Sequence, residues 1–389
     1  MLSKDIKFKN FKGKKINKSL KIFLKNLIDK KNDKNNLINS FTTSYLYSFN
    51  KKKINKYRKF NNYEIYGMGG SSLGAEAIYN FMKYKIKKKF YFFNNLDTKN
   101  HSIKNKKKSL NIIISKSGNT LETIINLNTN YNAKNKNIFI TENTENYLQK
   151  LANKLKSDVI EHPNFIGGRF SVMSEVGMLP AQLMGLDPKK FKRFNDLIFK
   201  KKFLDNLINN VINTYSFTKK KMCNSVILNY DEHSEDLFKW YQQLVSESLG
   251  KKSKGILPVI SCMPKDNHSV LQLYLSGFKP NFYTFFIVED KNSLRLNSKY
   301  LLDDFKFLKQ KNAFDILNSQ RISTQNIFKK KNIPFRSFYI KKRNEETLGE
   351  LFCFFTLETI LLSHLLMVNP LNQPEVESIK KETFRILKN

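Results

Sequence analysis

The chain has 389 residues, of which 40% are hydrophobic, and it contains 33 phenylalanines. This length and composition exclude disorder throughout and favour two or three folded domains. The formal charge is +36, from 69 Lys and Arg against 33 Asp and Glu, which raises nucleic-acid binding as a hypothesis. Because Lys, Asn, Ile and Phe are abundant in every part of the chain, and no face alternates basic with aromatic residues, we expect no nucleic-acid partner.

The cysteines and histidines argue against a disulfide framework and against a metal site. Cys223, Cys262 and Cys353 form no CxxC pair, and their number is odd. This pattern favours buried thiols in a reducing compartment. The five histidines form no HxH or HExxH cluster, so metal ligands close together in sequence are not expected.

Two segments bear on whether the chain is secreted or inserted into a membrane. Residues 1–15 are basic and contain no apolar run long enough for a signal peptide. Residues 351–368 are largely apolar but include Glu358 and His364, which favours a buried core helix over a membrane span. The sequence therefore predicts a cytoplasmic protein without a membrane partner.

The sequence patterns in the first half of the chain predict a helical segment followed by an α/β unit. Apolar residues between Leu20 and Ile28 recur at helical spacing, which predicts an N-terminal helix. From Tyr63, short apolar runs alternate with helical patterns. Strands are predicted at 63–68, 111–115 and 137–141, and helices at 73–82, from 121, and at 145–156.

The second half repeats this alternation. Strands are predicted at 225–229, 256–261, 283–288 and 335–340, and helices at 234–249, 313–329 and 345–367. Strands that alternate with helices indicate parallel sheets covered on both faces. We predict an α/β protein with two three-layer αβα domains, 1–190 and 191–389, the first of which carries the N-terminal helical segment. The boundary falls near Gly185 to Lys200, where Asp187-Pro188 and a Lys run break the periodicity.

The first turn suited to an anion is GMGGSSLG, residues 67–74, between a strand and a helix. Glycines there let the backbone approach an anion closely, and the helix start offers free N–H groups. Ser72 occupies the third glycine position of the dinucleotide fingerprint, and the lysine of a nucleotide P-loop is missing. We expect Gly70 and Ser71 to contact a phosphate.

The second such turn is SKSGNT, residues 115–120. Ser115, Lys116, Ser117 and Thr120 place three hydroxyls and one ammonium within six residues. Either turn alone could be an ordinary βα turn. Two of them at neighbouring strand ends favour a phosphosugar, because ligands of open α/β sheets bind at the carboxyl ends of strands. Both turns resemble those of the sugar isomerase (SIS) fold, a phosphosugar-binding module found in enzymes and in non-catalytic regulators. We therefore expect SIS-type domains.

Four further segments carry the motifs of one enzyme family. GGRFSVMSEVG (167–177), QQLVSESLGK (242–251), PKDNHS (264–269) and NPLNQPEVESIK (369–380) follow one another in the chain. Together with the two turns, they resemble the signature segments of the phosphoglucose isomerases, in the family's order. The chain is short for the family. The departures from its pattern are Glu175, Leu371, Asn372 and Glu375.

The resemblance implies roles for individual residues. Glu247 falls on the catalytic base, and His268, with Lys380 nearby, on the group that opens the sugar ring. Arg169 would stabilise the enediolate and Gln373 would hold the sugar. Without the resemblance, Arg169 could equally form a surface ion pair, His268 could be an ordinary loop histidine and Lys380 a solvated charge.

The helical pattern around Glu247 agrees with this role. Trp240, Leu244 and Glu247 follow one another at i, i+4 and i+7, so the carboxylate shares an apolar helix face. Gly250 is positioned as the C-cap. Desolvation would raise the pKa of such a carboxyl towards neutrality, which suits a general base. The alternative is a frayed, solvent-facing glutamate.

The resemblance implies interconversion of glucose 6-phosphate and fructose 6-phosphate through a cis-enediolate, in glycolysis and gluconeogenesis, without metal or organic cofactor. It also implies a homodimer in which the histidine loop reaches the partner's site. Two alternatives share the phosphate turns. They are a bifunctional phosphoglucose/phosphomannose isomerase and a non-catalytic phosphosugar-binding regulator.

Overall fold

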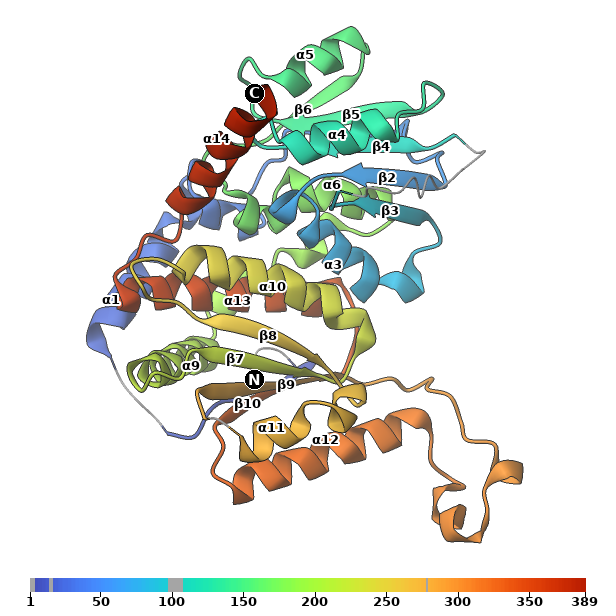
Figure 1. The fold of residues 1–389 in the computed structure, drawn as a ribbon, viewed down its shortest axis with the longest axis vertical. Helices are drawn as coiled ribbons and strands as arrows, with labels where there is room; N and C mark the ends of the chain where they lie inside the picture. Colours follow the sequence, from blue (N-terminus) through green and yellow to red (C-terminus); the bar gives the residue numbers. More distant parts are fainter. Residues whose placement is uncertain (1–3, 14–16, 97–107, 278) are drawn as a thin grey trace.

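The computed structural model describes residues 4–13, 17–96, 108–277 and 279–389. Two five-stranded sheets lie one above the other, with helices between them and on their outer faces (Figure 1). The strands are β1 (Ile6–Lys9), β2 (Asn62–Tyr66), β3 (Lys89–Phe93), β4 (Leu110–Ile114), β5 (Lys136–Thr141), β6 (Asp158–Glu161), β7 (Asn224–Asn229), β8 (Leu257–Cys262), β9 (Asn281–Val288) and β10 (Phe335–Ile340).

The helices connect and cover these strands. They are α1 (Lys18–Asp29), α2 (Lys51–Asn55), α3 (Leu73–Phe81), α4 (Leu121–Thr129), α5 (Tyr147–Lys154), α6 (Glu175–Leu183), α7 (Pro188–Phe191), α8 (Phe194–Ile198), α9 (Lys201–Lys219), α10 (Glu235–Leu249), α11 (Leu271–Ser276), α12 (Ala313–Lys330), α13 (Glu345–Leu366) and α14 (Pro374–Lys388). Short 3-10 helices add η3 (Gly69–Ser71), η5 (Gly168–Met173) and η7 (Lys265–His268).

The first sheet has the order β3-β2-β4-β5-β6, and each neighbouring pair is parallel. The chain passes from β2 to β3 on one side and then returns to β4 on the other. The strand order therefore reverses between β2 and β4, which is where an open α/β sheet offers a crevice for a ligand. The turns after β2 and β4 are the two phosphate turns predicted from the sequence.

The second sheet has the order β1-β10-β9-β7-β8, with β1 antiparallel to β10 and the other pairs parallel. The sequence assigned residues 1–190 to the first domain, whereas β1 forms an edge of the second sheet. Ile6 pairs with Ile340 and is fully buried. Phe8 packs on Phe338 of β10 and on Phe354 of α13, so the apolar side chains of this short strand are buried in the second domain.

The middle layer of helices forms the main core. α10 packs against α3 and α13 between the two sheets (Figure 1), and Trp240 lies edge-on to Phe352 with ring centroids 4.7 Å apart. Among the described residues, α13 is long and apolar enough to cross a membrane, with a mean hydropathy of 1.4, but 89% of that window is buried inside the protein. This burial agrees with the expected core helix.

A buried ion pair joins the second sheet to α13. Arg336 of β10 contacts Glu358 of α13, and each side chain is 1% exposed. Arg336 also donates to Asn210 and Thr284, at 2.9 Å each. Two charges this far from water depend on one another, since the loss of either partner leaves the other without compensation.

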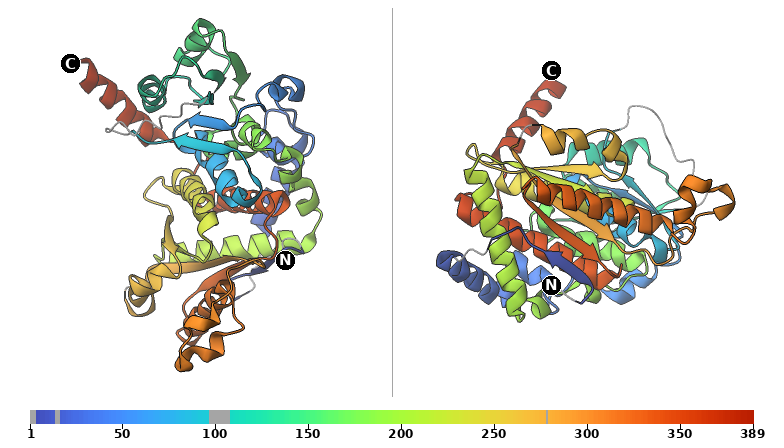
Figure 2. Two further views of the ribbon diagram at one scale, coloured as in Figure 1. Left: turned by 90° about the vertical axis from the view of Figure 1, so that its right-hand side faces the viewer. Right: turned by 90° about the horizontal axis from the view of Figure 1, so that it is seen from below.

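Two parts project from the body. In Figure 2, α14 extends away from both sheets, and none of its residues is buried. The segment 290–311 forms an excursion before α12 (Figure 1). Its exposed apolar side chains are Leu294, Tyr300, Leu302, Phe305 and Phe307.

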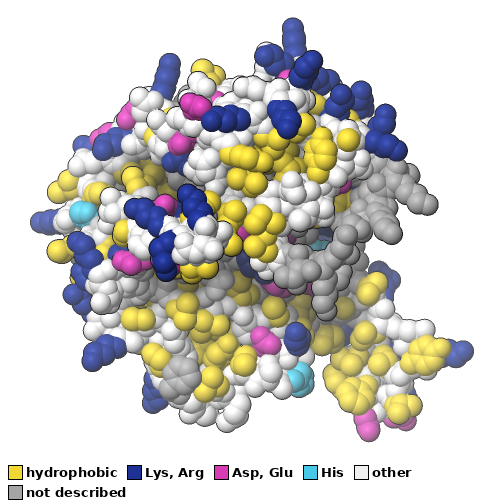
Figure 3. Space-filling view, turned by 45° about the horizontal axis from the view of Figure 1, so that its top comes forward, with side chains coloured by type: hydrophobic (Ala, Val, Ile, Leu, Met, Phe, Trp, Pro, Cys, Tyr) yellow, Lys and Arg dark blue, Asp and Glu magenta, His cyan; other side chains and the backbone are white. Residues whose placement is uncertain are grey.

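On the face shown in Figure 3, Lys and Arg are scattered over the surface rather than gathered in one patch.

The inner strands of both described sheets and the edge strand β8 are confirmed, whereas the other edge strands were missed. β10 has the predicted bounds, and β4, β5, β7 and β9 lie within two residues of theirs. β1, β3 and β6 were not predicted, and all three are edge strands. An edge strand is partly exposed, so it lacks the continuous apolar run of an inner strand.

The expectation of buried thiols is correct for Cys353 but wrong for Cys223, which is exposed.

Replacing Arg336 by Met should lower the free energy of unfolding by about 3–5 kcal/mol, because Glu358 would remain buried without its partner. Trp240 is the single tryptophan and is buried in this part of the core, so its fluorescence during chemical denaturation measures the change. The control is Arg385→Met, which removes an exposed ion pair with Glu382 and should leave the transition unmoved. Equal stability of Arg336→Met and the unaltered protein would contradict a structural role for the pair.

Candidate active site

The centre of the candidate site is an ion pair between the two domains. Arg169 comes from η5 of the first domain, and Glu247 from the last turn of α10 in the second. Arg169 Nε lies 3.2 Å from Glu247 Oε2, with the two side chains 3% and 28% exposed. Burial lowers the pKa of Arg169, and the carboxylate offsets part of that fall. The guanidinium still keeps its charge at any working pH.

Two polar atoms beside this pair have no hydrogen-bond partner. Arg169 Nε is near the carboxylate, but its N–H makes no hydrogen bond, and Gln243 Oε1 is also buried and unpaired. Gln243 Nε2 donates to Glu247 Oε1 at 2.8 Å. A buried polar atom without a partner is costly. Because both atoms are buried, a ligand hydroxyl could pair with them only after the side chains around the carboxylate move.

The C-terminal motif reaches the same guanidinium. Arg169 Nη2 donates to Gln373 Oε1 at 3.1 Å and to the carbonyl of Asn372 at 3.4 Å. A cavity of about 900 Å³ lies here, large enough for a sugar phosphate. Glu247, Lys251 and Gln373 are among its lining residues. The structure thus brings together Arg169, Glu247 and Gln373, which lie far apart in the sequence.

The glycine-rich turn packs directly against this cluster. A Cβ on Gly70 would lie 2.2 Å from the carbonyl carbon of Gly168, so only glycine allows the two backbones this contact. Ser171 Oγ donates to the carbonyl of Gly70 at 3.1 Å. Gly69 has a φ of +52°, and its missing side chain leaves room for Gln243. These contacts hold the turn against η5 and against Gln243 of α10.

The second phosphate turn begins at the end of β4, the strand next to β2. Ser115 Oγ and Thr120 Oγ1 are hydrogen-bonded at 2.8 Å, and Thr120 is the N-cap of α4. Ser117 Oγ accepts from the backbone N–H of Asn119 at 3.4 Å. The hydroxyls therefore gather where the helix start offers N–H groups to an anion.

Lys116 of this turn is held by other partners. Its Nζ donates to the carbonyl of Asn164 at 2.7 Å and lies 3.5 Å from Glu142 Oε1. In this arrangement the ammonium bridges the turn to the loop after β6. To reach a phosphate, it would have to give up at least one of these contacts.

Two predicted catalytic residues, His268 and Lys380, lie away from the Arg169–Glu247 pair in the fold. His268 is exposed in η7, after β8, and the end of β8 adjoins the start of α10, because Cys262 Sγ is 3.8 Å from Glu235 Oε2. Glu247 is at the other end of α10, 12 residues later, which is about 18 Å along a helix. One chain therefore does not bring His268 to its own Glu247.

Lys380 is also away from the pair. It lies on α14, is 51% exposed, and its Nζ contacts Glu377 Oε1 at 2.7 Å on the same helix. α13 ends at Met367, which has a left-handed backbone, and Gln373 precedes the first residue of α14. The motif residues before α14 therefore meet Arg169, whereas those within it point away from the body.

Two residues of the site were missed by the sequence reasoning. Gln243 precedes Glu247 by four residues, so their helical spacing could have identified it. Lys251 Nζ donates to the carbonyls of Asn369 and Ser248, at 2.7 and 3.0 Å. Burial, and then the charge of Arg169, lower the pKa of Lys251 to about 8. The sequence around Lys251 does not indicate its place in the site, because Asn369, to whose carbonyl it donates, lies more than a hundred residues away.

Comparison with known proteins gives consistent results. A family model described as Phosphoglucose isomerase matches residues 15–256. The chain is 33% identical to the glucose-6-phosphate isomerase of Methanocaldococcus jannaschii, over 87% of this chain and 88% of that protein. It is 31% identical to the glucose-6-phosphate isomerase of Mycoplasmopsis synoviae, over 83% of this chain and 81% of that protein.

Solved structures share the fold. A hypothetical protein from Thermus thermophilus superposes with a TM-score of 0.82 at 21% identity, covering 95% of each chain. A glucose-6-phosphate isomerase from Chlamydia trachomatis superposes with a TM-score of 0.67 at 18% identity, covering 87% of this chain and 72% of that one. At these identities the likeness concerns the fold alone, an α/β arrangement of three-layer units.

Replacing Gly70 by Ala should lower stability by about 1–3 kcal/mol through overpacking and reduce the site's activity by as much as about 100-fold, since displacements near 1 Å have that effect. Gly167→Ala is the matched control. A Cβ there meets nothing closer than 3.8 Å. Thermal unfolding and steady-state turnover of both variants measure the difference. If Gly70→Ala behaves like Gly167→Ala, the contact does not position the site.

Proposed function

The chain belongs to the phosphoglucose isomerase family, and from that premise we propose that it interconverts glucose 6-phosphate and fructose 6-phosphate as a glucose-6-phosphate isomerase. One observation carries the proposal, the Glu247 carboxylate held 3.2 Å from the buried guanidinium of Arg169. Aldose–ketose isomerisation needs a base for the proton on C2 and a positive charge for the enediolate, and this pair supplies both.

Glu247 is proposed to take the proton from C2 and return it to C1, so that one carboxylate serves both steps. The cis-enediolate between these steps carries negative charge on its oxygens. Arg169 would stabilise this charge with its guanidinium, whose buried Nε–H makes no hydrogen bond within the described residues. A charge that is already oriented stabilises a transition state most effectively in a site shielded from water. Gln243 and Gln373 are placed to hold sugar hydroxyls.

The phosphate is proposed to lie between the two turns of the first sheet. The hydroxyls of Ser71, Ser115, Ser117 and Thr120, with backbone N–H groups near Gly70, offer donors at this edge. Lys116 would join them after leaving Glu142. Support comes from the reversal of strand order between β2 and β4, the usual location of a ligand in such a sheet.

Ring opening is assigned to His268 and Lys380. Because about one helix length separates His268 from the Glu247 of its own chain, we propose that His268 acts in the site of a second copy, within a homodimer. Two uncovered apolar surfaces support such a contact, the segment 290–311 and the apolar residues of α14. Lys380 would approach the sugar through a reorientation of α14 at the turn after Met367.

The protein is proposed to work in the cytoplasm, in glycolysis and gluconeogenesis, without a nucleic-acid or membrane partner. General acid–base chemistry by side chains moves both protons, so the proposal includes no metal and no organic cofactor.

Glu247→Gln should reduce kcat for fructose 6-phosphate formation by a factor on the order of 100 or more, since the amide cannot accept the C2 proton. Substrate affinity should change little, because the amide keeps the size of the carboxylate. A coupled spectrophotometric assay measures both quantities. Glu232→Gln, at an exposed position just before α10, is the control. Turnover of Glu247→Gln within a few-fold of the unaltered enzyme would remove Glu247 from the mechanism.

If each active site combines Glu247 of one chain with His268 of the other, hybrid dimers should behave differently from both parent variants. Glu247→Gln and His268→Gln homodimers should both be inactive. A hybrid with one chain of each kind should regain about half of full activity, because one of its two symmetric sites has both residues intact. Co-expression with two affinity tags isolates the hybrid. A hybrid as inactive as its parents would contradict a site built from two chains.

A further inference from the structure

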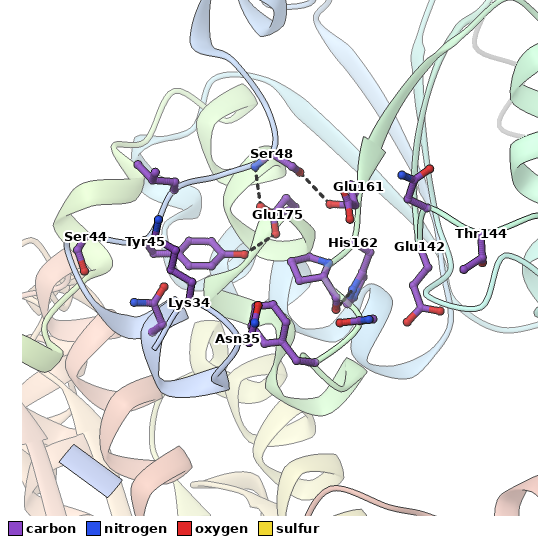
Figure 4. A pocket seen from close by; sticks show the side chains of 16 residues that line it. Lys34, Asn35, Ser44, Tyr45, Ser48, Glu142, Thr144, Glu161, His162 and Glu175 are labelled. Carbon is purple, nitrogen blue, oxygen red and sulfur yellow. Dashed lines mark hydrogen bonds between the residues drawn. The ribbon is translucent and has the colours of Figure 1, made fainter. Parts of the chain in front are cut away.

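A second cavity lies at the carboxyl ends of β5 and β6. Its volume is about 370 Å³, and it shares no lining residue with the cavity beside Glu247. Its walls come from the N-terminal arm, from the loops after β5 and β6, and from the start of α6 (Figure 4). This volume lies at the lower end of the range found for small-molecule pockets.

The lining of this cavity is acidic, although the chain as a whole is strongly basic. Its charged residues are Glu142, Glu161, Glu175 and one cation, Lys34. The oxygens of Glu175 are already bound, by Tyr45 Oη and the backbone N–H of Ser48 at 2.9 Å each (Figure 4). Glu175 therefore belongs to the wall. Glu161 is exposed, and Glu142 pairs with Lys116, whose Nζ lies 3.5 Å from Glu142 Oε1, so a ligand would share Glu142 with that lysine.

The wall around Glu175 is rigid. Lys192 is buried behind it, with Nζ 4.8 Å from the ring centroids of both Tyr45 and Tyr47. This ammonium also donates to the carbonyls of Ser40 and Met173. The sequence identified Glu175 as a departure from the family pattern, so this wall is a feature of the present chain rather than of the shared signature.

His162 supplies an independent indication of a ligand. Its side chain lines the cavity, the residue is 1% exposed, and Nδ1 lies 3.0 Å from the carbonyl of Pro163. A carbonyl only accepts, so Nδ1 carries the hydrogen. Burial lowers the pKa of His162 to about 4, which leaves the ring neutral at neutral pH. Nε2 is then an acceptor, and no described residue donates to it.

The ligand that fits these groups is an organic cation. An unprotonated ring nitrogen and two carboxylates are acceptors only. A hard metal ion would require a closer set of ligands, and within the described part of the chain no group of three or more His, Cys, Asp or Glu could hold one. An ammonium group, with three N–H donors, satisfies several separated acceptors.

We propose that this cavity binds a short aliphatic diamine, whose two ammonium groups pair with Glu142 and Glu161 while one of them donates to His162. Lys34 is exposed, and as the one cation of the lining it opposes this binding.

The same cavity touches the proposed phosphate turn. Lys116 pairs with Glu142 and donates to the carbonyl of Asn164, and both partners line the cavity. A bound ammonium neutralises Glu142, so Lys116 loses its ionic partner and turns more easily towards a phosphate. The diamine would therefore lower KM for the sugar phosphate, an effect that rests on the proposed function. By linkage, the sugar phosphate would tighten diamine binding equally.

Calorimetric titration of 1,4-diaminobutane into the full-length protein, at constant ionic strength, tests the site. Saturable binding is expected, at least tenfold weaker in Glu142→Gln and in Glu161→Gln, and tighter in Lys34→Gln. Glu145→Gln is the matched control, since its carboxylate is 80% exposed, pairs with Lys150 and lies outside the cavity. Its affinity should stay within twofold. Absence of saturable binding, affinities of Glu142→Gln and Glu161→Gln equal to that of the unaltered protein, or displacement by low-millimolar Mg²⁺ would overturn the assignment.

The isomerase assay tests the coupling separately. Saturating 1,4-diaminobutane should lower KM at least twofold with kcat unchanged, and Glu161→Gln should abolish the effect. Binding with an unchanged KM would overturn the coupling to Lys116. If the proposed function fails, turnover is absent while the diamine still binds. If the cavity proposal fails, turnover is present and no diamine binds.

Discussion

The contact between Arg169 and Glu247 is the constraint on which the site depends. A guanidinium that is almost fully buried needs a counter-charge, and the only carboxylate in contact with it, within the described residues, comes from the other domain. The two domains must therefore meet in one relative position. The glycine contact between the turn after β2 and η5 fixes the backbone that carries Arg169. Gly69 of the same turn leaves room for Gln243 of α10, and Gln243 holds the carboxylate from within its own helix.

This constraint explains why the chemistry lies at a junction. The first sheet offers N–H groups and hydroxyls at its carboxyl edge, which suit an anion but cannot move a proton. α10 of the second domain brings the carboxylate, and the segment before α14 brings Gln373. Their convergence at Arg169 places a candidate base beside a fixed positive charge, and residues of α10 and of the segment before α14 line the cavity next to this pair.

Much of this could be predicted from the sequence. Inner strands such as β4 and β9 are continuous apolar runs, and the motif residues Arg169, Glu247 and Gln373 indeed converge. The edge strands β1, β3 and β6 were missed because half-exposed residues lack a clear period, whereas the edge strand β8 was predicted. The positions of His268 and Lys380 could not be predicted either, because they depend on how β8 packs against α10 and on the direction that α14 takes after the left-handed Met367. Gln243 was overlooked although it shares a helix face with Glu247.

The central claim is that Glu247 acts on the carbon next to the carbonyl of a phosphosugar held by the two turns. A crystal structure with an enediolate mimic of the six-carbon sugar phosphate tests it most directly. The account predicts the mimic's C1–C2 unit within about 3–3.5 Å of the Glu247 carboxylate, with Arg169 Nε donating to its oxygen and the phosphate between the turns after β2 and β4. A mimic bound elsewhere, with Glu247 facing bulk water, would contradict the account.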